Sequence, residues 1–195
     1  WSLSGNADLK PEKGWSYEIG AKYSNDNTSW HIGFYYLEMT DKIKINNTWT
    51  SYINVAEFRS YGIEASKRWS LGQNWKLGLN GTWQKPEEKV TSSFSWARGQ
   101  GMPEWKIGGS LEYKTGPWAA LLSANWVGNR MGDAANNWNP DDYVMVDLTI
   151  SWKQDNDTVR LYCINLFDED YTFESGGWYY YGPERGFRLS WEHRF

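Results

Sequence analysis

Aromatic and arginine side chains gather in the long polar segments of this 195-residue chain, between stretches that alternate apolar and polar residues. The densest run is Gly176–Tyr181, "GGWYYY". Flat rings can stack on a ligand, and an arginine can clamp an anion through two parallel hydrogen bonds. The predicted ligand-binding residues are Trp49, Tyr52, Trp96, Arg98, Arg130, Trp138, Trp178, Tyr179, Tyr180 and Tyr181, with Phe94, Phe173 and Arg185 of the same kind. The alternative is that these rings pack loop against loop.

The other residues give little support for a catalytic site. The two histidines, His31 and His193, lie in alternating stretches and lack the neighbours of a Ser-His-Asp arrangement. The carboxylates of Asp155–Thr158 and Asp168–Tyr171 could hold calcium, but solvated turns are the favoured interpretation. The stretch "GQGMPE" lacks the lysine and the strand–loop–helix context of a phosphate loop. We therefore predict no enzyme activity, no metal site and no cofactor.

The elements that position the candidate residues are predicted to be β-strands. Apolar residues recur at every second position from Trp15 to Tyr23 and again from Trp75 to Trp83. No helical spacing persists over a useful length, so the chain is predicted to be all-β. The expected strands lie near 14–24, 29–46, 53–69, 74–85, 104–114, 117–128, 142–153, 158–170 and 184–195. Thr158–Leu166 has apolar residues at both odd and even positions. The sequence therefore does not show which side of this strand belongs to the apolar face of the sheet.

The composition argues against some classes of protein and leaves a membrane β-barrel possible. The net charge of −4 argues against a nucleic-acid partner held through phosphates. The mean hydropathy is −0.74, and no apolar run approaches the roughly 20 residues of a membrane helix. A membrane β-barrel remains compatible with such values, because only alternate residues face lipid. The 15 tryptophans and 13 tyrosines far exceed the needs of an ordinary core.

Loop lengths and aromatic spacing both indicate a barrel in a membrane. Short turns at 25–27, 70–73, 114–116 and 153–157 alternate with long connections, as in outer-membrane barrels. Aromatic residues recur eight apart on one parity, as in Trp75 and Trp83. Eight residues of strand rise about 26 Å, or roughly 20 Å along the membrane normal at a tilt near 40°. A soluble sandwich would have no reason to place its largest rings at both strand ends.

Three stretches resemble signatures of the TonB-dependent outer-membrane receptors. They are "GNADLKPEKGWSYEIGAKY" (Gly5–Tyr23), "INVAEFRSYGIEASKRW" (Ile53–Trp69) and "INLFDEDY" (Ile164–Tyr171), and they follow the order found in that family. The last strand, "GFRLSWEHRF", is similar to the signal that the barrel-assembly machinery reads. Its signal residues are Phe187, Leu189, Trp191 and Phe195. His193 departs from the pattern, since an apolar or aromatic residue is usual there.

The resemblance implies a transmembrane antiparallel β-barrel of 22 strands in the bacterial outer membrane. A plug domain, the TonB complex and the outer-membrane lipid are the implied partners. About nine strands are expected here, and an odd number leaves two open edges that lipid does not tolerate. Residues 1–195 are therefore expected to be the C-terminal part of the barrel, without the plug and the earlier strands.

The implied function is active uptake of a small-molecule metal chelate, with a ferric siderophore favoured by the aromatic and arginine residues. Cobalamin, haem and oligosaccharide are alternatives, although the long connections offer no histidine for a haem iron. A passive porin or a small stand-alone barrel is a second alternative. An outer-membrane protease would need His–Asp pairs above the rim, and the sequence supplies none there.

Overall fold

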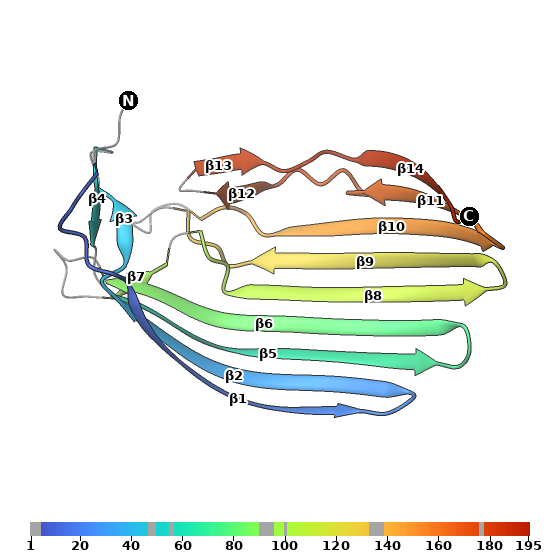
Figure 1. Cartoon of the computed structure of the whole chain (residues 1–195), viewed down its shortest axis with the longest axis horizontal. Helices are drawn as coiled ribbons and strands as arrows, with labels where there is room; N and C mark the ends of the chain where they lie inside the picture. The colour runs from blue at the N-terminus through green and yellow to red at the C-terminus, as the bar shows by residue number, and fades with distance from the viewer. Residues whose placement is uncertain are drawn as a thin grey trace.

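One large antiparallel sheet contains most of the described backbone (Figure 1). The structure, a computed structural model, describes residues 5–46, 50–54, 57–89, 96–99, 101–132, 139–175 and 178–195. Along one path, nine strands each pair antiparallel with the next. They are β1 (Lys13–Ser24), β2 (Thr28–Thr40), β5 (Glu57–Leu71), β6 (Trp75–Lys89), β8 (Trp105–Thr115), β9 (Trp118–Gly128), β10 (Tyr143–Gln154), β11 (Asp157–Ile164) and β14 (Gly186–His193).

Short strands lie at one end of this sheet. The strands β3 (Ile43–Ile45) and β4 (Tyr52–Asn54) form one hairpin, and β12 (Thr172–Ser175) and β13 (Trp178–Tyr181) form another. The two-residue strand β7 (Ala97–Arg98) pairs with the far end of β6. No described segment is a helix that could cross a membrane. The all-β, antiparallel prediction is confirmed, with nine strands on the main path of the described sheet.

Several predicted strand limits are wrong, for backbone reasons. The expected strand 29–46 breaks after Thr40, because Asp41 takes a φ of 56° and the chain then turns into β3. The expected strand 158–170 ends at Ile164, because Asn165 takes a φ of 52°. Such left-handed residues leave the pleat, and asparagine and aspartate tolerate them better than most residues do. The expected long loop near 172–184 holds the hairpin of β12 and β13.

Strand register sorts the side chains into an apolar and a polar face. Leu77, Leu111, Leu122, Leu148 and Cys163 stand directly opposite one another along one cross-strand row. Directly opposed residues share a face of a sheet. The row also settles the facing of β11, where Val159 and Leu161 lie on the apolar face with Trp191 and Leu189 of β14. The alternating apolar residues that the sequence predicts for each strand all lie on this one face.

Aromatic rings border the apolar face at both ends of the strands. Toward the long connections, the Trp83 ring centroid lies 6.1 Å from that of Tyr61 and 6.2 Å from that of Trp105. Toward the short turns, the Tyr23 and Trp30 centroids lie 6.3 Å apart. The Trp75 and Tyr113 centroids lie 4.4 Å apart at the same end. Mostly apolar residues lie between the two rows, with Lys67 opposite Leu79 as an exception. Apart from that lysine, this is the pattern of a lipid-facing band between two aromatic girdles.

Within the described residues, neither face of the sheet is covered by another layer. The chain exposes 13561 Å², whereas a compact monomer of this mass would expose about 9,600 Å². Among the described residues only Phe58, Met131, Val146 and Cys163 are buried hydrophobic side chains. The outermost strands, β1 and β14, each pair with a single neighbour in the described sheet. The apolar face and both edges are therefore surfaces that require partners.

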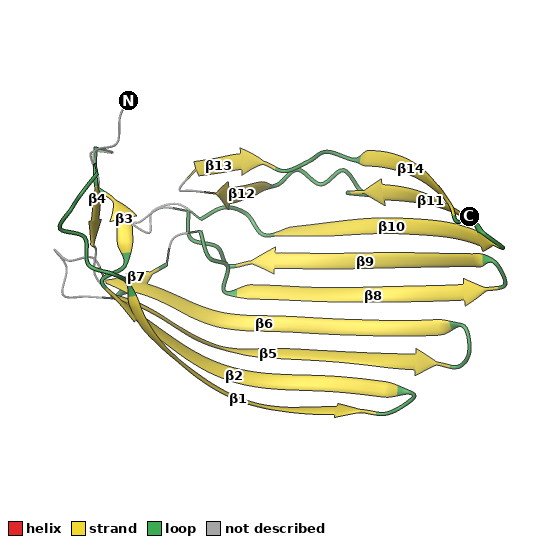
Figure 2. Ribbon diagram, in the orientation of Figure 1, coloured by secondary structure: helices red, strands yellow, loops and turns green. Residues whose placement is uncertain are grey.

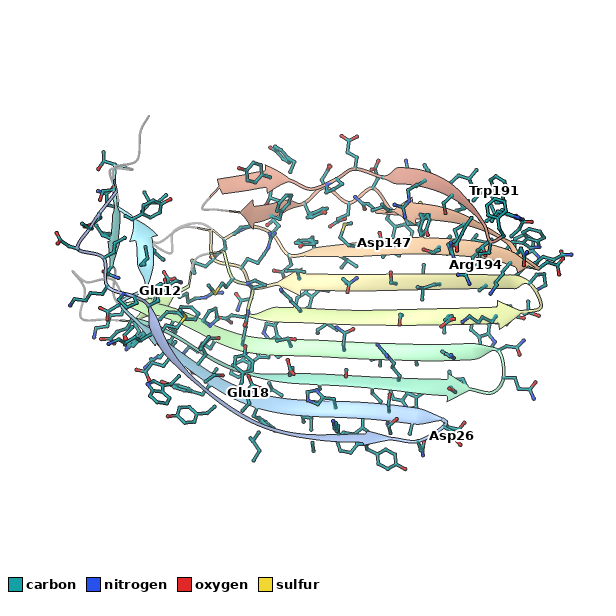
Figure 3. All side chains as sticks on the ribbon, in the orientation of Figure 1. Glu12, Glu18, Asp26, Asp147, Trp191 and Arg194 are labelled. Carbon is teal, nitrogen blue, oxygen red and sulfur yellow. The ribbon has the colours of Figure 1, made fainter. Side chains whose placement is uncertain are left out.

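Tight turns close the other end of the strands (Figure 2). Left-handed residues make several of them: Gly72 with a φ of 74°, Gly116 with 52° and Asp155 with 50°. In the first turn the Asn25 side chain accepts hydrogen bonds from the backbone N–H groups of Asn27 and Thr28, at 3.0 and 2.8 Å. Glu12 and Asp26 mark the two ends of β1 in Figure 3. The long connections thus gather at the Glu12 end, where the candidate site lies.

Candidate functional site

A belt of charged side chains lies on the apolar face just beyond the aromatic row at the long-connection end. Glu38, Arg59, Glu87 and Arg98 stand opposite one another, two residues beyond Tyr36 and Tyr61. Arg59 Nε donates to Glu87 Oε2 at 2.7 Å, and Lys85 Nζ lies 3.4 Å from Glu87 Oε1. Charges cannot enter hydrocarbon cheaply. The belt therefore marks where the apolar band ends.

Trp96, a predicted ligand-binding residue, packs on this belt. The Arg59 guanidinium lies 4.1 Å from the centroid of the Trp96 ring. On the opposite face of β6, Glu88 binds Lys42 at 2.8 Å and also contacts Lys44 of β3. The β3–β4 hairpin is thus held against the sheet by ion pairs. Sequence reasoning missed these carboxylates, although their cluster Glu87–Glu88 at the end of a long strand was visible.

Arg98, predicted as an anion clamp, ties two long connections together. Its guanidinium pairs with Glu104 at 3.0 Å and donates to the backbone carbonyl of Asn129 at 2.8 Å. Asn129, with a φ of 54°, donates its backbone N–H to Asp142 Oδ1 at 2.8 Å. The connection before β8 is thereby fixed to the connection between β9 and β10. Any anion bound by Arg98 would share it with Glu104.

Arg130 is buried, with 6% of its surface exposed, beneath the connections at the start of β10. It donates to the backbone carbonyls of Thr172 and Asp141, and its guanidinium lies 4.8 Å from the Tyr143 ring centroid. The Tyr143 ring also stacks on Tyr171, with centroids 4.5 Å apart. Burial raises the pKa of the Tyr171 phenol above its usual value. This arrangement holds the β12–β13 hairpin against β10.

The remaining predicted ligand-binding residues divide into exposed, partly described and undescribed ones. Tyr181 is 87% exposed, and Tyr180 stacks on Phe173 with centroids 5.8 Å apart. Tyr52, on β4, is also exposed. The structure describes the backbone of Trp178 and Tyr179 in β13, but not their side chains, while Phe94, Trp49 and Trp138 lie outside the described residues. Arg185 pairs with Asp168 at 3.7 Å. The aromatic surface available for a ligand is thus centred on β12 and β13.

Two asparagines that sequence reasoning did not single out organise the long-connection end. Asn165 is fully buried at 0% exposure, and its side chain donates to the carbonyls of Glu169 and Pro183 at 2.9 and 3.0 Å. Its backbone N–H donates to Asp147 Oδ1 at 2.9 Å (Asp147 is labelled in Figure 3). Asn54 joins β4 to Lys10 in a similar way. The sequence did point to both asparagines, because each lies within one of the stretches quoted above as family signatures.

A hollow of about 250 Å³ opens on the polar face beside these connections. Lys106, Val127 and Tyr143 form its floor and stand directly opposite one another on β8, β9 and β10. Its other walls are Gly101, Pro103, Arg130, Met131 and Phe173. The Gly101 N–H donates to the Met131 carbonyl at 2.9 Å, which fixes two of the walling segments. Lys106 was not predicted as a ligand-binding residue.

The predicted assembly signal lies on the apolar face of β14. Phe187, Leu189 and Trp191 oppose Cys163, Leu161 and Val159 of β11. Trp191 Nε1 donates to Asp157 Oδ1 at 2.9 Å, and His193 Nδ1 lies 2.9 Å from the same oxygen. Phe195 is exposed and meets the His193 ring edge to face at 4.9 Å. The unusual His193 therefore has a local partner in Asp157. The role of these residues in assembly stays a prediction.

The histidines and carboxylates of these surfaces lie apart from the candidate site. In the part of the chain that the structure describes, no group of three His, Cys, Asp or Glu side chains could hold a metal ion. His31 lies 3.7 Å from Glu64 on the polar face, near the short-turn end of β2. His193 contacts Asp157 at the turn end, far along the sheet from the long connections. Neither pair adjoins the hollow or the exposed aromatic residues.

Comparisons with known proteins agree with this architecture. A family model described as "TonB dependent receptor-like, beta-barrel" matches residues 1–166. The vitamin B12 transporter BtuB of Photobacterium profundum is 28% identical over 180 residues, covering 88% of this chain and 29% of that protein. The ferric aerobactin receptor of Escherichia coli is 27% identical over 185 residues, covering 88% of this chain and 24% of that protein.

A solved structure gives the same result for the fold. The ferric citrate transporter FecA in its unliganded form superposes with a TM-score of 0.81 at 18% identity, over 95% of this chain and 32% of that one. The chain thus spans less than a third of the length of these relatives. By name, these three relatives are transporters or receptors. Because the family model covers most of the sequence, the chain belongs to the TonB-dependent receptors, a family of outer-membrane β-barrels.

Proposed function

We propose that residues 1–195 form the C-terminal wall of a receptor barrel that takes up a metal chelate, with a ferric siderophore as the favoured cargo. The observation that carries the proposal is the exposed aromatic surface on β12 and β13. Phe173, Tyr180 and Tyr181 present rings there on the side of the long connections. Such rings suit the flat, conjugated groups of many iron chelates. The names of the ferric aerobactin and rhizobactin receptors among its relatives support the same cargo class.

The two open edges of the sheet support the rest of the proposal. An unpaired strand edge in lipid costs several kcal/mol for each unsatisfied backbone group. Strand β14 would pair with the first strand of the complete barrel, and β1 would pair with the strand that precedes it there. The polar face would then line a lumen that holds the plug. Uptake would depend on energy delivered through TonB, and no step of it is enzymatic.

The test is uptake of iron-55 chelates by cells that produce the complete receptor. Hydroxamate, catecholate and citrate chelates of ferric iron should be compared at low external concentration. We expect saturable uptake of one chelate class that stops when TonB is removed. Equal uptake of all solutes without TonB would instead identify a passive pore, and a heat-stable closed barrel formed by this chain alone would identify a small stand-alone barrel.

Cobalamin is the second candidate cargo, and a specific similarity favours it. Two relatives at 28% identity carry the name vitamin B12 transporter, and one of them aligns with 100% of this chain. Cobalamin is neutral over most of its surface and therefore has less need of arginine than an anionic ferric chelate has. Growth that depends on added vitamin B12, measured with and without the receptor, separates the two cargoes. Growth rescue by cobalamin with no iron uptake would replace the siderophore proposal.

A further inference from the structure

The hollow floored by Lys106, Val127 and Tyr143 has the composition of a small binding site. Its three floor residues lie on adjacent strands of the sheet, so their spacing is set by hydrogen-bonded register and not by a loop. Its volume of about 250 Å³ falls just below the 300–1,000 Å³ typical of whole drug-sized ligands. A site of that size can take one arm of a larger ligand.

The ammonium group of Lys106 gives the hollow a positive charge that a ligand could pair with. Glu104, the carboxylate nearest along the strand, is engaged with Arg98 at 3.0 Å and also accepts from Asn129. Among the residues that the structure describes, Lys106 forms no ion pair and no side-chain hydrogen bond. An ammonium group on a long stem is a compact point charge that binds carboxylate or phosphate oxygens. Lys106 can therefore accept an anionic group from outside.

Much of the remaining lining of the hollow is apolar. Val127, Met131, Tyr143 and Phe173 line it with aliphatic, thioether and aromatic surface. Tyr143 is held in place by stacking on Tyr171 at 4.5 Å and by the Arg130 guanidinium at 4.8 Å. The backbone carbonyl of Pro103 is fixed by a hydrogen bond from Gln84 at 2.8 Å. These walls are positioned before any ligand arrives, which lowers the entropy cost of binding.

We propose that this hollow binds a carboxylate whose neighbouring atoms are aromatic or apolar, with Lys106 Nζ holding the carboxylate and Tyr143 and Phe173 flanking the ring. The proposal deepens the proposed function and rests on it only in supposing that the group is one arm of the transported ligand. Phosphate monoesters fit less well, because a dianion would find a single available cation here.

Benzoate and its neutral analogue benzamide are suitable probes, because they differ in charge and scarcely in shape. Binding to the complete receptor, purified in detergent, should be measured by saturation-transfer difference NMR titration. We expect wild-type receptor to prefer benzoate by about tenfold, as a charge-assisted hydrogen bond would give. The variant Lys106→Met should lose that preference. Lys76→Met, which removes a lysine from the polar face of β6 outside the hollow, should keep it.

Folding of each variant is checked by its electrophoretic mobility without boiling, and Phe173→Ala gives a second measurement. That variant should weaken benzoate and benzamide together and so preserve their ratio. Equal binding of both probes to wild type, or an unchanged preference in Lys106→Met, would overturn the assignment. The binding measurement needs no TonB and no cargo. Loss of energised uptake alongside an intact benzoate preference would therefore count against the proposed function alone.

Discussion

Asn54 and Lys10, 44 residues apart, are joined by two hydrogen bonds. Asn54 Oδ1 accepts from the Lys10 backbone N–H at 2.8 Å, and Asn54 Nδ2 donates to the Lys10 carbonyl at 2.9 Å. Nδ2 also donates to the Asp41 carbonyl at 2.6 Å. Nearby, the Ile43 N–H donates to Glu12 Oε1 at 2.7 Å. The segment before β1 is thereby fastened to the β3–β4 hairpin.

Replacing Asn54 should loosen this fastening without disturbing the membrane band. We expect Asn54→Asp to be worse than Asn54→Ala, because a carboxylate would face two backbone carbonyls in place of the amide donor. The expected cost of Asn54→Asp is about 1–3 kcal/mol of unfolding free energy. Urea unfolding of the complete receptor in micelles measures it. Asn125→Ala, on the exposed polar face of β9, is the matched control, and an equal effect at Asn125 would contradict the assigned role.

The orientation of the sheet in lipid predicts a strong asymmetry between neighbouring positions of β9. Leu122 lies mid-band, 41% exposed on the apolar face, while Ser123 lies on the polar face. Arginine at Leu122 should cost about 2–4 kcal/mol, and arginine at Ser123 far less. Folding yields into lipid vesicles across a urea series would report the difference. Equal tolerance at both positions would refute the lipid assignment of the apolar face. Leu79 is a poorer test site, because Lys67 stands directly opposite it.

Asn165 offers a way to separate backbone strain from hydrogen bonding. Its φ of 52° suits glycine, while its buried amide makes bonds that glycine cannot supply. Asn165→Gly should therefore lose about 2 kcal/mol through the missing bonds. Asn165→Ala should lose a further ~1 kcal/mol through the left-handed backbone. Unfolding free energies of the two variants test the order, and alanine proving equal to or better than glycine would contradict it.

The exposed ring of Tyr181 should contribute to cargo binding without a structural role. At 87% exposure it makes no ring contact found among the described residues, unlike Tyr180, which stacks on Phe173. We expect Tyr181→Ala to weaken chelate binding about fivefold, the scale of one aromatic contact. Stability should not change. Tyr180→Ala serves as the comparison, since it should affect both binding and the hairpin. Unaltered affinity in Tyr181→Ala would remove this residue from the proposed site.

The period-two pattern predicted the strands and their faces well, because a sheet with one face in lipid admits a single register. A shift by one residue would send Arg68 and Lys76 into hydrocarbon. The breaks at Asp41 and Asn165 were not predicted, since a left-handed asparagine or aspartate looks like any polar residue in a sequence. The partners of Arg98 and Arg130 were equally hidden. Both look like free cations until folding brings Glu104 and the carbonyls of Thr172 and Asp141 beside them.

The spacing of the two aromatic rows also determines which membrane thickness this sheet fits. Eight residues separate Trp75 from Trp83, so the apolar slab between the girdles is roughly 20 Å thick at the usual strand tilt. An average bilayer has a hydrocarbon thickness of about 30 Å, and the bacterial outer membrane is thinner. In a thicker bilayer, Arg59 and Glu87, just beyond Tyr61, would be drawn toward the hydrocarbon. Hydrophobic mismatch would therefore make this sheet less stable in a thicker inner membrane than in the thinner outer membrane.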